Sequence, residues 1–589
     1  MKKITYILLA LPLLIGCDLD RTPLDALAPE NTFNNKEELE TATNGFYAML
    51  PNAEDLYGET ADLVVPTLTN EVLGIRTVPA SGGGWSWRLL SDINTCLIYS
   101  ARCKDANVRA EYDGVSRFFR AYFYFEKVRR FGEVPWFDTP LTSTDDRLYQ
   151  GRTDRNTLLA NMMADIDYAV QHLPTAKNTY KVTKWTALAL KSRIALFEGT
   201  FRKYHGINGY EQFLQQAADA AKDFIDNAPY TIYKEGNTPY MSLFASKNAI
   251  NSEVVMALNY NIGLNIVHDL NRFFTSDGAK PGLNKKIVDS YLMYDGTRFT
   301  DKADYQTMGF YDEMQGRDPR LAQTIVTPGY KRIGGTDVLS PSFSAATTGY
   351  QIIKGVTTPA DDAWHKSQND FPLFRAAEVY LNYAEAKAEL GTLTQADLDA
   401  SILKIRQRVG MPGIDMAAAN ATPDPYLSNE ETGYPNVTGA NKGVILEIRR
   451  ERTIELLAEG LRYDDLMRWK AGKTFEQQFK GMVIPKFDDT KHFVVCDLNG
   501  NGVNDAEDVC IYEGDIDNIK ANAEVANIRQ FLKLGVNLHV ANGANGGNII
   551  VHDIANNQRK WNEDRDYLYP IPQDQITIYG GVIKQNPGW

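Results

Sequence analysis

Residues Asp497 to Asp508 place oxygen-bearing side chains at the spacing of a calcium-binding loop. In DLNGNGVNDAED, Asp497 occupies position 1, Asp508 position 12, and Gly502 position 6, where such a loop turns sharply. The expected ligands are five side chains and the Val503 carbonyl: Asp497, Asn499, Asn501, Val503, Asp505 and Asp508. Aspartate ends the loop in place of the usual glutamate and reaches less far, which leaves bidentate closure open. We expect Ca²⁺ in a structural role; the alternative is an acidic Asn/Gly-rich turn.

The segments on either side of this loop predict strands rather than the helices of an EF-hand. HFVVC ends at Cys496, and VCIYEG begins at Val509. We therefore expect a calcium-loop insertion at about residues 490–515. Cys496 and Cys510 bracket the loop, so a hairpin would bring them near each other. An exported location would permit a disulfide between them, but the sequence leaves that pairing open.

A second charged stretch, Val444 to Lys470, has the pattern of a packed helix. Ile454, Leu457 and Leu461 recur on one stripe. Acidic and basic residues crowd the same turns: Glu447, Arg450, Glu451, Arg452, Glu455 and Glu459. We interpret these as partly buried ion pairs that fix helix packing. Acid–base catalysis is not expected, because no nucleophile or metal-type histidine lies nearby.

Aromatic residues in loops are the candidates for ligand contact. Trp85 and Trp87 follow three glycines just before a predicted helix, and Phe274 and Trp364 lie in the long irregular stretch 230–371. Long loops in a helical protein are usually functional. Flat rings stack on the apolar faces of sugars. The alternative for each ring is packing in the core.

Charge and the N-terminus limit the partners and the location. The 589-residue chain has a formal net charge of −13 and no basic run, which argues against nucleic acid. Lys2 and Lys3 precede a short apolar run that ends in Leu14-Ile15-Gly16-Cys17, a bacterial lipobox. We predict a signal peptide at residues 1–16, a lipid-anchored Cys17 that attaches the protein to a membrane, and a tether over residues 17–35. Cys96 and Cys103 are expected to be buried thiols.

Most of the remaining chain predicts paired helices. The expected pairs are Val115–Phe131 with Thr157–Leu173, Trp185–Thr200 with Tyr210–Asn227, Phe374–Leu390 with Asp397–Val409, and the helix at Val444 with the segment after Tyr463. These resemble degenerate tetratricopeptide repeats, which must stack to bury their apolar faces. We predict a mainly α, single domain over 36–589. Its superhelical scaffold spans about 115–229 and 372–480, with a loop-rich ligand-side insertion at about 230–371 and a few short strands.

Several segments resemble the SusD/RagB family of outer-membrane nutrient-binding lipoproteins from starch-utilisation-type systems. The motifs are VILEIRRERTIELLAEGLRYDDLMRWK, LYPIPQDQI, KQNPGW, VSRFFRAYFYFEKVRRFGEVPWF, LFRAAEVYLNYAEAKAELG, DGTRF and GRDPRLAQTI. The resemblance implies a SusD-like fold and a binding-site Trp just before a helix. With Asp18 and Asp20 after Cys17, it also implies a lipoprotein on the outer face of the outer membrane. Its implied function is non-enzymatic: to capture oligo- or polysaccharide and deliver it to a SusC-like TonB-dependent transporter.

Two other functions remain open from the sequence. One is peptide capture, as in the RagB branch of the family. The other is an all-helical glycoside hydrolase, which needs two carboxylates about 5 or 6.5–9.5 Å apart. No carboxylate pair stands out in an aromatic setting, and the Trp85/Trp87 loop favours a glycan. The sequence does not identify which glycan.

Overall fold

The computed structural model describes residues 32–589 except 59, 60, 66, 67, 143, 277, 489 and 555–557. The predicted signal peptide, Cys17 and most of the predicted tether lie outside the described residues. Within the described ranges, no helix combines the length and the apolar character needed to cross a membrane.

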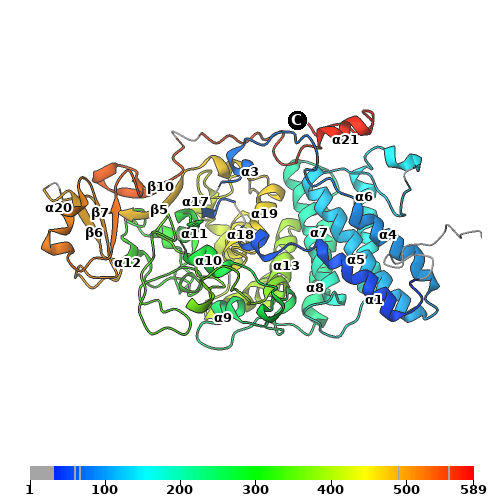
Figure 1. The fold of residues 1–589 in the computed structure, drawn as a ribbon, viewed down its shortest axis with the longest axis horizontal. Helices are drawn as coiled ribbons and strands as arrows, with labels where there is room; N and C mark the ends of the chain where they lie inside the picture. Colours follow the sequence, from blue (N-terminus) through cyan, green and yellow to red (C-terminus); the bar gives the residue numbers. More distant parts are fainter. Residues whose placement is uncertain are drawn as a thin grey trace, which may run out of the picture.

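The N-terminal part of the chain forms a helical half of the molecule (Figure 1). Its helices are α1 (Lys36–Asn44), α4 (Arg88–Tyr99), α5 (Ala106–Phe131), α6 (Arg155–His172), α7 (Lys184–His205) and α8 (Tyr210–Asn227). The short helices α2 (Ala53–Tyr57) and α3 (Asn70–Leu73) come early in the chain but pack in the core of the other half. The start of α7 is fixed by Thr183, whose hydroxyl accepts the Thr186 N–H. The helix ends at Gly206, which adopts a left-handed φ of 71°.

The first two predicted helix pairs are confirmed, because α5 packs on α6 and α7 packs on α8. The α7–α8 crossing is close: a Cβ on Gly199 would lie 2.8 Å from Leu214 Cγ. Small residues thus let these two helices approach each other. The Ala-rich pattern of α7 serves the same packing.

The later helix pairs are present but more broken than predicted. In the third pair, α13 (Ala376–Leu390) lies between α8 and α18, and its predicted partner divides at Ser401 into α14 (Gln395–Ala400) and α15 (Ile402–Arg406). In the fourth, α18 (Lys442–Glu455) ends well before Lys470 and is followed by α19 (Arg462–Arg468). Ala458 and Gly460 between them have positive φ angles, which a helix does not allow.

The other half is built of loops, short helices and small sheets. Its helices are α9 (Pro239–Ala245), α10 (Leu270–Thr275), α11 (Lys285–Ser290), α12 (Phe310–Glu313) and α20 (Ile516–Lys520). The short helices α16 (Met416–Ala421), α17 (Pro425–Ser428) and α21 (Gln573–Ile578) pack against the core of the helical half. The strands are β1 (Val64–Val65), β2 (Val254–Leu258), β3 (Gly282–Leu283), β4 (Phe371–Arg375), β5 (Phe479–Ile484), β6 (Phe493–Cys496), β7 (Val509–Tyr512), β8 (Gln530–Lys533), β9 (His539–Val540) and β10 (Gly547–Val551). β1 pairs with β3 and β2 with β4, while β10 lies between β5 and β9 and β7 between β6 and β8.

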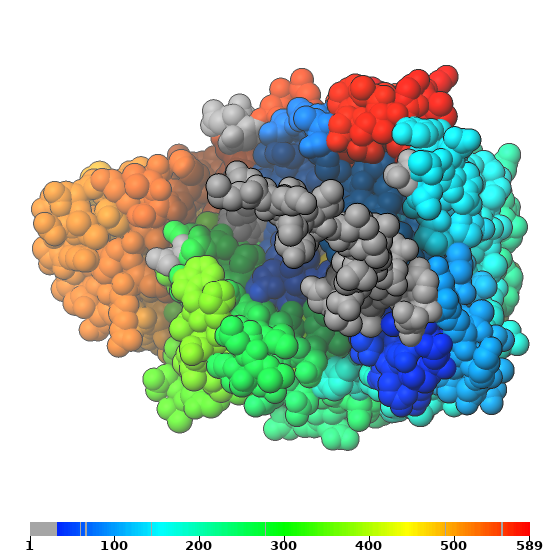
Figure 2. All heavy atoms as spheres, turned by 45° about the vertical axis from the view of Figure 1, so that its right-hand side comes forward, coloured from blue at the N-terminus to red at the C-terminus, as the bar shows by residue number. Residues whose placement is uncertain are grey.

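The predicted strands around the acidic loop are confirmed as the antiparallel pair β6–β7, with β8 parallel to β7. This three-stranded unit projects from one end of the molecule (orange, Figure 2). Its register pairs Cys496 with Val509 and Val495 with Cys510. Because neighbouring side chains on a strand point to opposite faces, the two thiols face opposite sides of the sheet and both are free. Cys96 and Cys103 are buried free thiols, as predicted.

The predicted ion pairs of α18 are confirmed as a buried lattice. Arg375 forms ion pairs with Glu253 (3.0 Å), Glu455 (2.7 Å) and Glu459 (2.7 Å). Arg408 reaches both Glu253 and Glu455 at 2.9 Å. These side chains come from β4, the end of α18 and the turn after it, the residue before β2 and the turn after α15, so the lattice joins segments far apart in sequence.

Two large hydrophobic clusters form the cores of the two halves. One lies among the long helices and includes Val444 and Ile448; the other lies in the loop-rich half and includes Ile454 and Leu457. Helix α18 and the turn after it therefore contribute to both cores. The charged residues of α18 connect the halves at the same place.

Candidate ligand-binding surface

Trp85 and Trp87 lie in an aromatic cluster at the start of α4. Trp85 is buried, with its ring edge-on to Phe131 at 5.0 Å and to Trp87 at 5.5 Å between centroids. Trp87 is half-buried against Phe137 at 5.4 Å, and Lys127 Nζ lies 5.7 Å from its ring centre. Trp85 thus has little surface left for a ligand, whereas Trp87 retains part of its own.

Phe274 was predicted to contact a ligand, but its side chain is buried and cannot do so in this structure. The side chain is fully buried in α10 and packs against Phe273 and Tyr57, with centroid distances of 5.1 and 6.0 Å. The short helix turns this ring into the core of the loop-rich half. Sequence position alone did not reveal that turn.

Trp364 is the predicted ring that the structure leaves open to solvent, with 62% of its surface exposed. The guanidinium carbon of Arg272, on α10, lies 4.3 Å from the centre of the indole ring. This cation–π contact supports one part of the ring and leaves the rest free. Such a supported, exposed indole can stack on a flat apolar ligand face.

The loop that carries Trp364 is fastened to α10 by hydrogen bonds. The His365 N–H donates to Asp269 Oδ1 at 2.5 Å, and His365 Nδ1 lies 3.3 Å from Asp269 Oδ2. Asn271 Nδ2 donates to Asp362 Oδ1 at 3.2 Å. We call Trp364, His365, Asp269 and Arg272 the Trp364 platform. Asp269 and Arg272 were not predicted as part of the site, because they lie about ninety positions from Trp364 in the chain.

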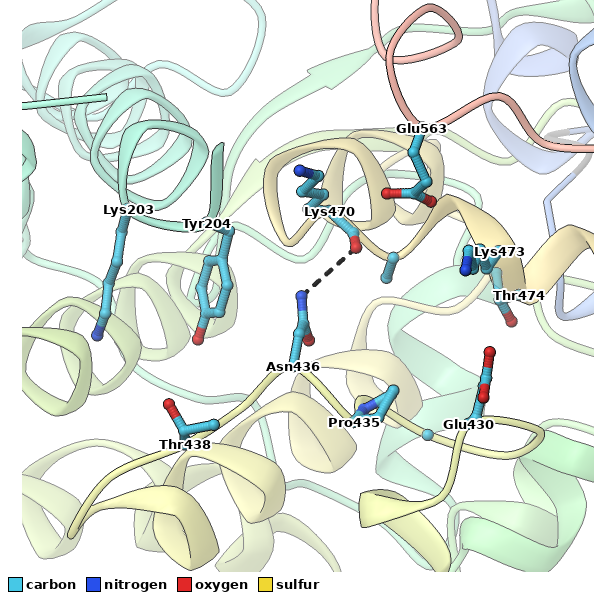
Figure 3. Close-up of a pocket in the computed structure, with 12 residues that line it drawn as sticks. Lys203, Tyr204, Glu430, Pro435, Asn436, Thr438, Lys470, Lys473, Thr474 and Glu563 are labelled. Carbon is cyan, nitrogen blue, oxygen red and sulfur yellow. Dashed lines mark hydrogen bonds between the residues drawn. The ribbon is translucent and has the colours of Figure 1, made fainter. Parts of the chain in front are cut away.

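A polar pocket of about 580 Å³ opens between the end of α7, residues 430–438, the end of α19 and Glu563 (Figure 3). Asn436 Nδ2 donates to the Trp469 carbonyl at 2.6 Å and to the Lys470 carbonyl at 3.4 Å, the contact dashed in Figure 3. Burial raises the pKa of Glu563, although the Tyr567 hydroxyl, Lys470 and Lys473 favour its charged form. The pocket thus offers both hydrogen-bond donors and acceptors. The residues that line this pocket come from four segments far apart in sequence. No local sequence motif could therefore predict the pocket.

The acidic loop is closed in the structure by hydrogen bonds of its own. Asp497 accepts the N–H groups of Gly500 at 2.6 Å and Gly502 at 2.9 Å. Asp508 accepts the N–H groups of Leu498 and Asp505. Gly502 has a φ of 71°, as expected for the sharp turn. The backbone therefore has the compact form that the calcium pattern predicts.

The side chains of this loop fit a cation only with some rearrangement. Burial raises the pKa of Asp508, and the neighbouring carboxylates Asp505 and Asp497 add to the effect. The side-chain amides of Asn499 and Asn501 both donate to Asp505 Oδ2. To ligate a metal, these side chains would have to turn so that their oxygens, not their nitrogens, face it. In the described part of the chain, no group of three or more His, Cys, Asp or Glu side chains is already gathered around a metal position. The donor types suit Ca²⁺, and calcium binding stays a prediction.

The stacked helix pairs and the long loop-rich insertion define a helix-repeat protein with an added loop-rich half. The model of the SusD family matches residues 252–589, more than half of the chain. The chain therefore belongs to the SusD family.

Curated relatives share part of their length with this chain. "SusD-like protein P25" of Formosa agariphila is 24% identical over 41% of this chain and 48% of its own length. "SusD-like protein P2" of the same organism is 26% identical over 34% of this chain and 44% of its own length. The matched stretch thus spans about half the length of these relatives.

Solved structures share the fold across nearly the whole chain. A SusD-like protein from Bacteroides fragilis has a TM-score of 0.67 and 20% identity, covering 97% of this chain and 100% of its own. A SusD-like carbohydrate-binding protein from the same organism has a TM-score of 0.65 and 20% identity, covering 94% and 99%. A laminarin-binding SusD-like protein has a TM-score of 0.55 and 16% identity, covering 94% and 100%. These confirm the mainly helical SusD-like fold.

Proposed function

We propose that this protein is a cell-surface lipoprotein that captures oligo- or polysaccharide and delivers it to a SusC-like TonB-dependent transporter. Cys17 would carry the lipid anchor on the outer face of the outer membrane, and the protein would have no catalytic role. Membership of the SusD family supports this proposal, as does the carbohydrate binding named for one structural neighbour.

The observation that carries the proposal is the Trp364 platform. Its indole is exposed, yet its position is fixed by Arg272 and by the hydrogen bonds of the next residue to Asp269. A rigid ring loses little conformational freedom when a sugar stacks on it, so more of the contact energy appears as affinity. Arg272 and Asp269 add polar groups beside the ring for sugar hydroxyls.

The test is affinity electrophoresis of the chain without residues 1–17, which removes none of the described structure. The gels would contain laminarin, starch, xylan, mannan or polygalacturonate. We expect one of these glycans to retard the wild type. Trp364→Ala should weaken that binding about 5- to 30-fold, as the loss of one well-placed aromatic contact predicts. Tyr149→Ala, at another exposed aromatic residue, is the control and should bind like the wild type.

Other outcomes separate the alternative functions. Release of reducing ends from the bound glycan at a sustained rate would identify a hydrolase instead. If no glycan binds but a tryptic casein digest does, peptide capture replaces glycan capture. Equal retardation of the wild type and Trp364→Ala would remove the platform from the binding site.

A further inference from the structure

Three pockets adjoin one another around residues 424–438, which we call the 424–438 segment. The pocket of Figure 3 shares Thr474 with a second pocket of about 500 Å³. The second shares Tyr305, Gln306, Tyr426, Glu431 and Thr432 with a third of about 260 Å³. The 424–438 segment lines all three, and we call this row of adjoining pockets the groove along the segment. Each of the larger two has the volume of an ordinary small-molecule site.

The 424–438 segment is held rigidly in place. Buried Asp424 caps α17 by accepting the Tyr426 N–H at 2.7 Å, and it forms an ion pair with Arg450. Tyr426 donates its hydroxyl proton to the Lys286 carbonyl at 3.0 Å. At Gly433 a Cβ would lie 2.0 Å from the Leu427 carbonyl oxygen, so only glycine allows this close turn. The groove is therefore preformed.

Tyr305 stands at the junction of the second and third pockets. Its ring is half-buried and lies edge-on to Phe299 at 6.1 Å and to Tyr426 at 6.2 Å between centroids. Two buried rings thus fix the orientation of a third whose remaining surface faces the groove. This is the arrangement in which an aromatic ring stacks on a sugar without losing much side-chain freedom.

Amide side chains line the second pocket together with Tyr305, and they have two roles. Asn284, Gln478 and Asn548 bond to the backbone and shape the wall. Gln477 and Asn542 also line the second pocket, but their side chains form no hydrogen bond to a described residue. An amide donates and accepts at once, which matches the paired donor and acceptor character of a sugar hydroxyl.

The charges of the groove balance. Lysines and carboxylates line the three pockets in equal number. Some are already neutralised within the protein: Lys286 pairs with Asp62 at 2.9 Å, and Lys203 pairs with Glu389 at 2.6 Å. With a chain of net charge −13 around it, this groove gives a polyanion no electrostatic advantage.

We propose that the groove along the 424–438 segment is a second binding site, which takes a segment of an uncharged glycan chain with Tyr305 as its stacking surface. The site is separate from the Trp364 platform, none of whose four residues lines the three pockets. This inference rests on the proposed function. Two sites on one protein would hold the same long polysaccharide at two points and raise the overall affinity by effective concentration.

The experiment is isothermal titration calorimetry on the chain without residues 1–17, with oligosaccharides cut from laminarin, starch, xylan and mannan. In the Trp364→Ala background we expect residual binding to one of these neutral glycans. Adding Tyr305→Ala should weaken that residual binding at least about tenfold, and Asn542→Ala should weaken it less. Tyr305→Phe keeps the ring and should stay within about twofold of its parent.

The controls distinguish a loss of binding from a loss of folding. Tyr149→Ala in the same background should leave the residual binding unchanged, and melting curves of all variants should coincide within a few degrees. The inference is overturned if Trp364→Ala abolishes all binding, if Tyr305→Ala leaves the residual binding intact, or if polygalacturonate fragments bind the groove more tightly than neutral ones. If the wild type binds none of these glycans, the proposed function fails first and this inference falls with it.

Discussion

Glu455 is a fully buried carboxylate that stays charged because arginines surround it. Burial by itself would raise its pKa, but Arg408, Arg375 and Arg320 hold the pKa at about 2. The closest of these contacts is 2.7 Å, from Arg375. Since the folded pKa lies below the ordinary value near 4.5, the charged carboxylate stabilises the fold above that pH.

We predict that this stabilisation is lost as the pH falls from about 4.5 towards 2, by about 3 kcal/mol for this single group. Glu455→Gln should lower the free energy of unfolding at pH 7 by about 3–5 kcal/mol, because three guanidinium groups lose a buried partner. The variant should also lose part of the dependence of stability on pH in that range. Denaturant unfolding at several pH values measures both effects.

The control for Glu455 is Glu235→Gln, an exposed glutamate in a loop. Its stability should stay within about 0.5 kcal/mol of the wild type at every pH. Equal effects of the two variants would show that the buried lattice has no special electrostatic role.

At the scale of elements, the acidic loop Asp497–Asp508 connects the antiparallel strands β6 and β7. The one-residue offset between Cys496 and Cys510 leaves no cross-link between the strands, so the loop depends on hydrogen bonds to Asp497 and Asp508 for its shape. A cation there would relieve the repulsion among Asp497, Asp505 and Asp508.

We predict that Ca²⁺ binds this loop with a Kd of about 0.1–1 mM, the range of extracellular calcium modules. Calorimetric titration of the chain without residues 1–17 should show a site that Asp497→Ala removes. Asp517→Ala, in α20 outside the loop, should keep it. Identical titrations of the wild type and Asp497→Ala would leave the loop as an acidic turn.

At the scale of the whole molecule, the buried lattice couples the two halves. Arg375 joins Glu253, just before β2, to Glu455 at the end of α18 and to Glu459 in the turn after it. The same helix contributes apolar residues to both cores. A substitution in this lattice should therefore lower the local stability of both halves.

We predict that Arg375→Met speeds amide hydrogen exchange both in β2, whose Val255 and Met256 pack in the core of the helical half, and in residues 318–325 of the loop-rich half. Glu253, beside β2, loses Arg375 as a partner, and so does Glu455, which also pairs with Arg320 at 3.1 Å. Arg193→Met is the matched control. Its partner Glu378, at 2.6 Å, lies on α13, so that variant should loosen only the helical half. Exchange followed by mass spectrometry separates the two patterns. Protection unchanged in residues 318–325 in Arg375→Met would contradict the coupling.

The sequence by itself determined the helix pairs, the ion-pair role of α18 and the strands around the acidic loop. These follow from local periodicity and charge, which persist in short windows whatever the rest of the chain does. It also indicated the family through long motifs. The break after Glu455 was missed, because Ala458 gives no sign in its own sequence that it adopts a positive φ.

Only the tertiary structure decided which aromatic rings face solvent. Phe274 and Trp364 look alike in sequence, yet one is fully buried and the other is 62% exposed. The difference arises from contacts about ninety residues apart, between α10 and the loop that ends at His365. The groove along the 424–438 segment likewise combines Tyr305, Thr474 and Asn542, residues that no local pattern relates. Binding surfaces of this kind exist only once the chain has folded, because burial and long-range packing set them.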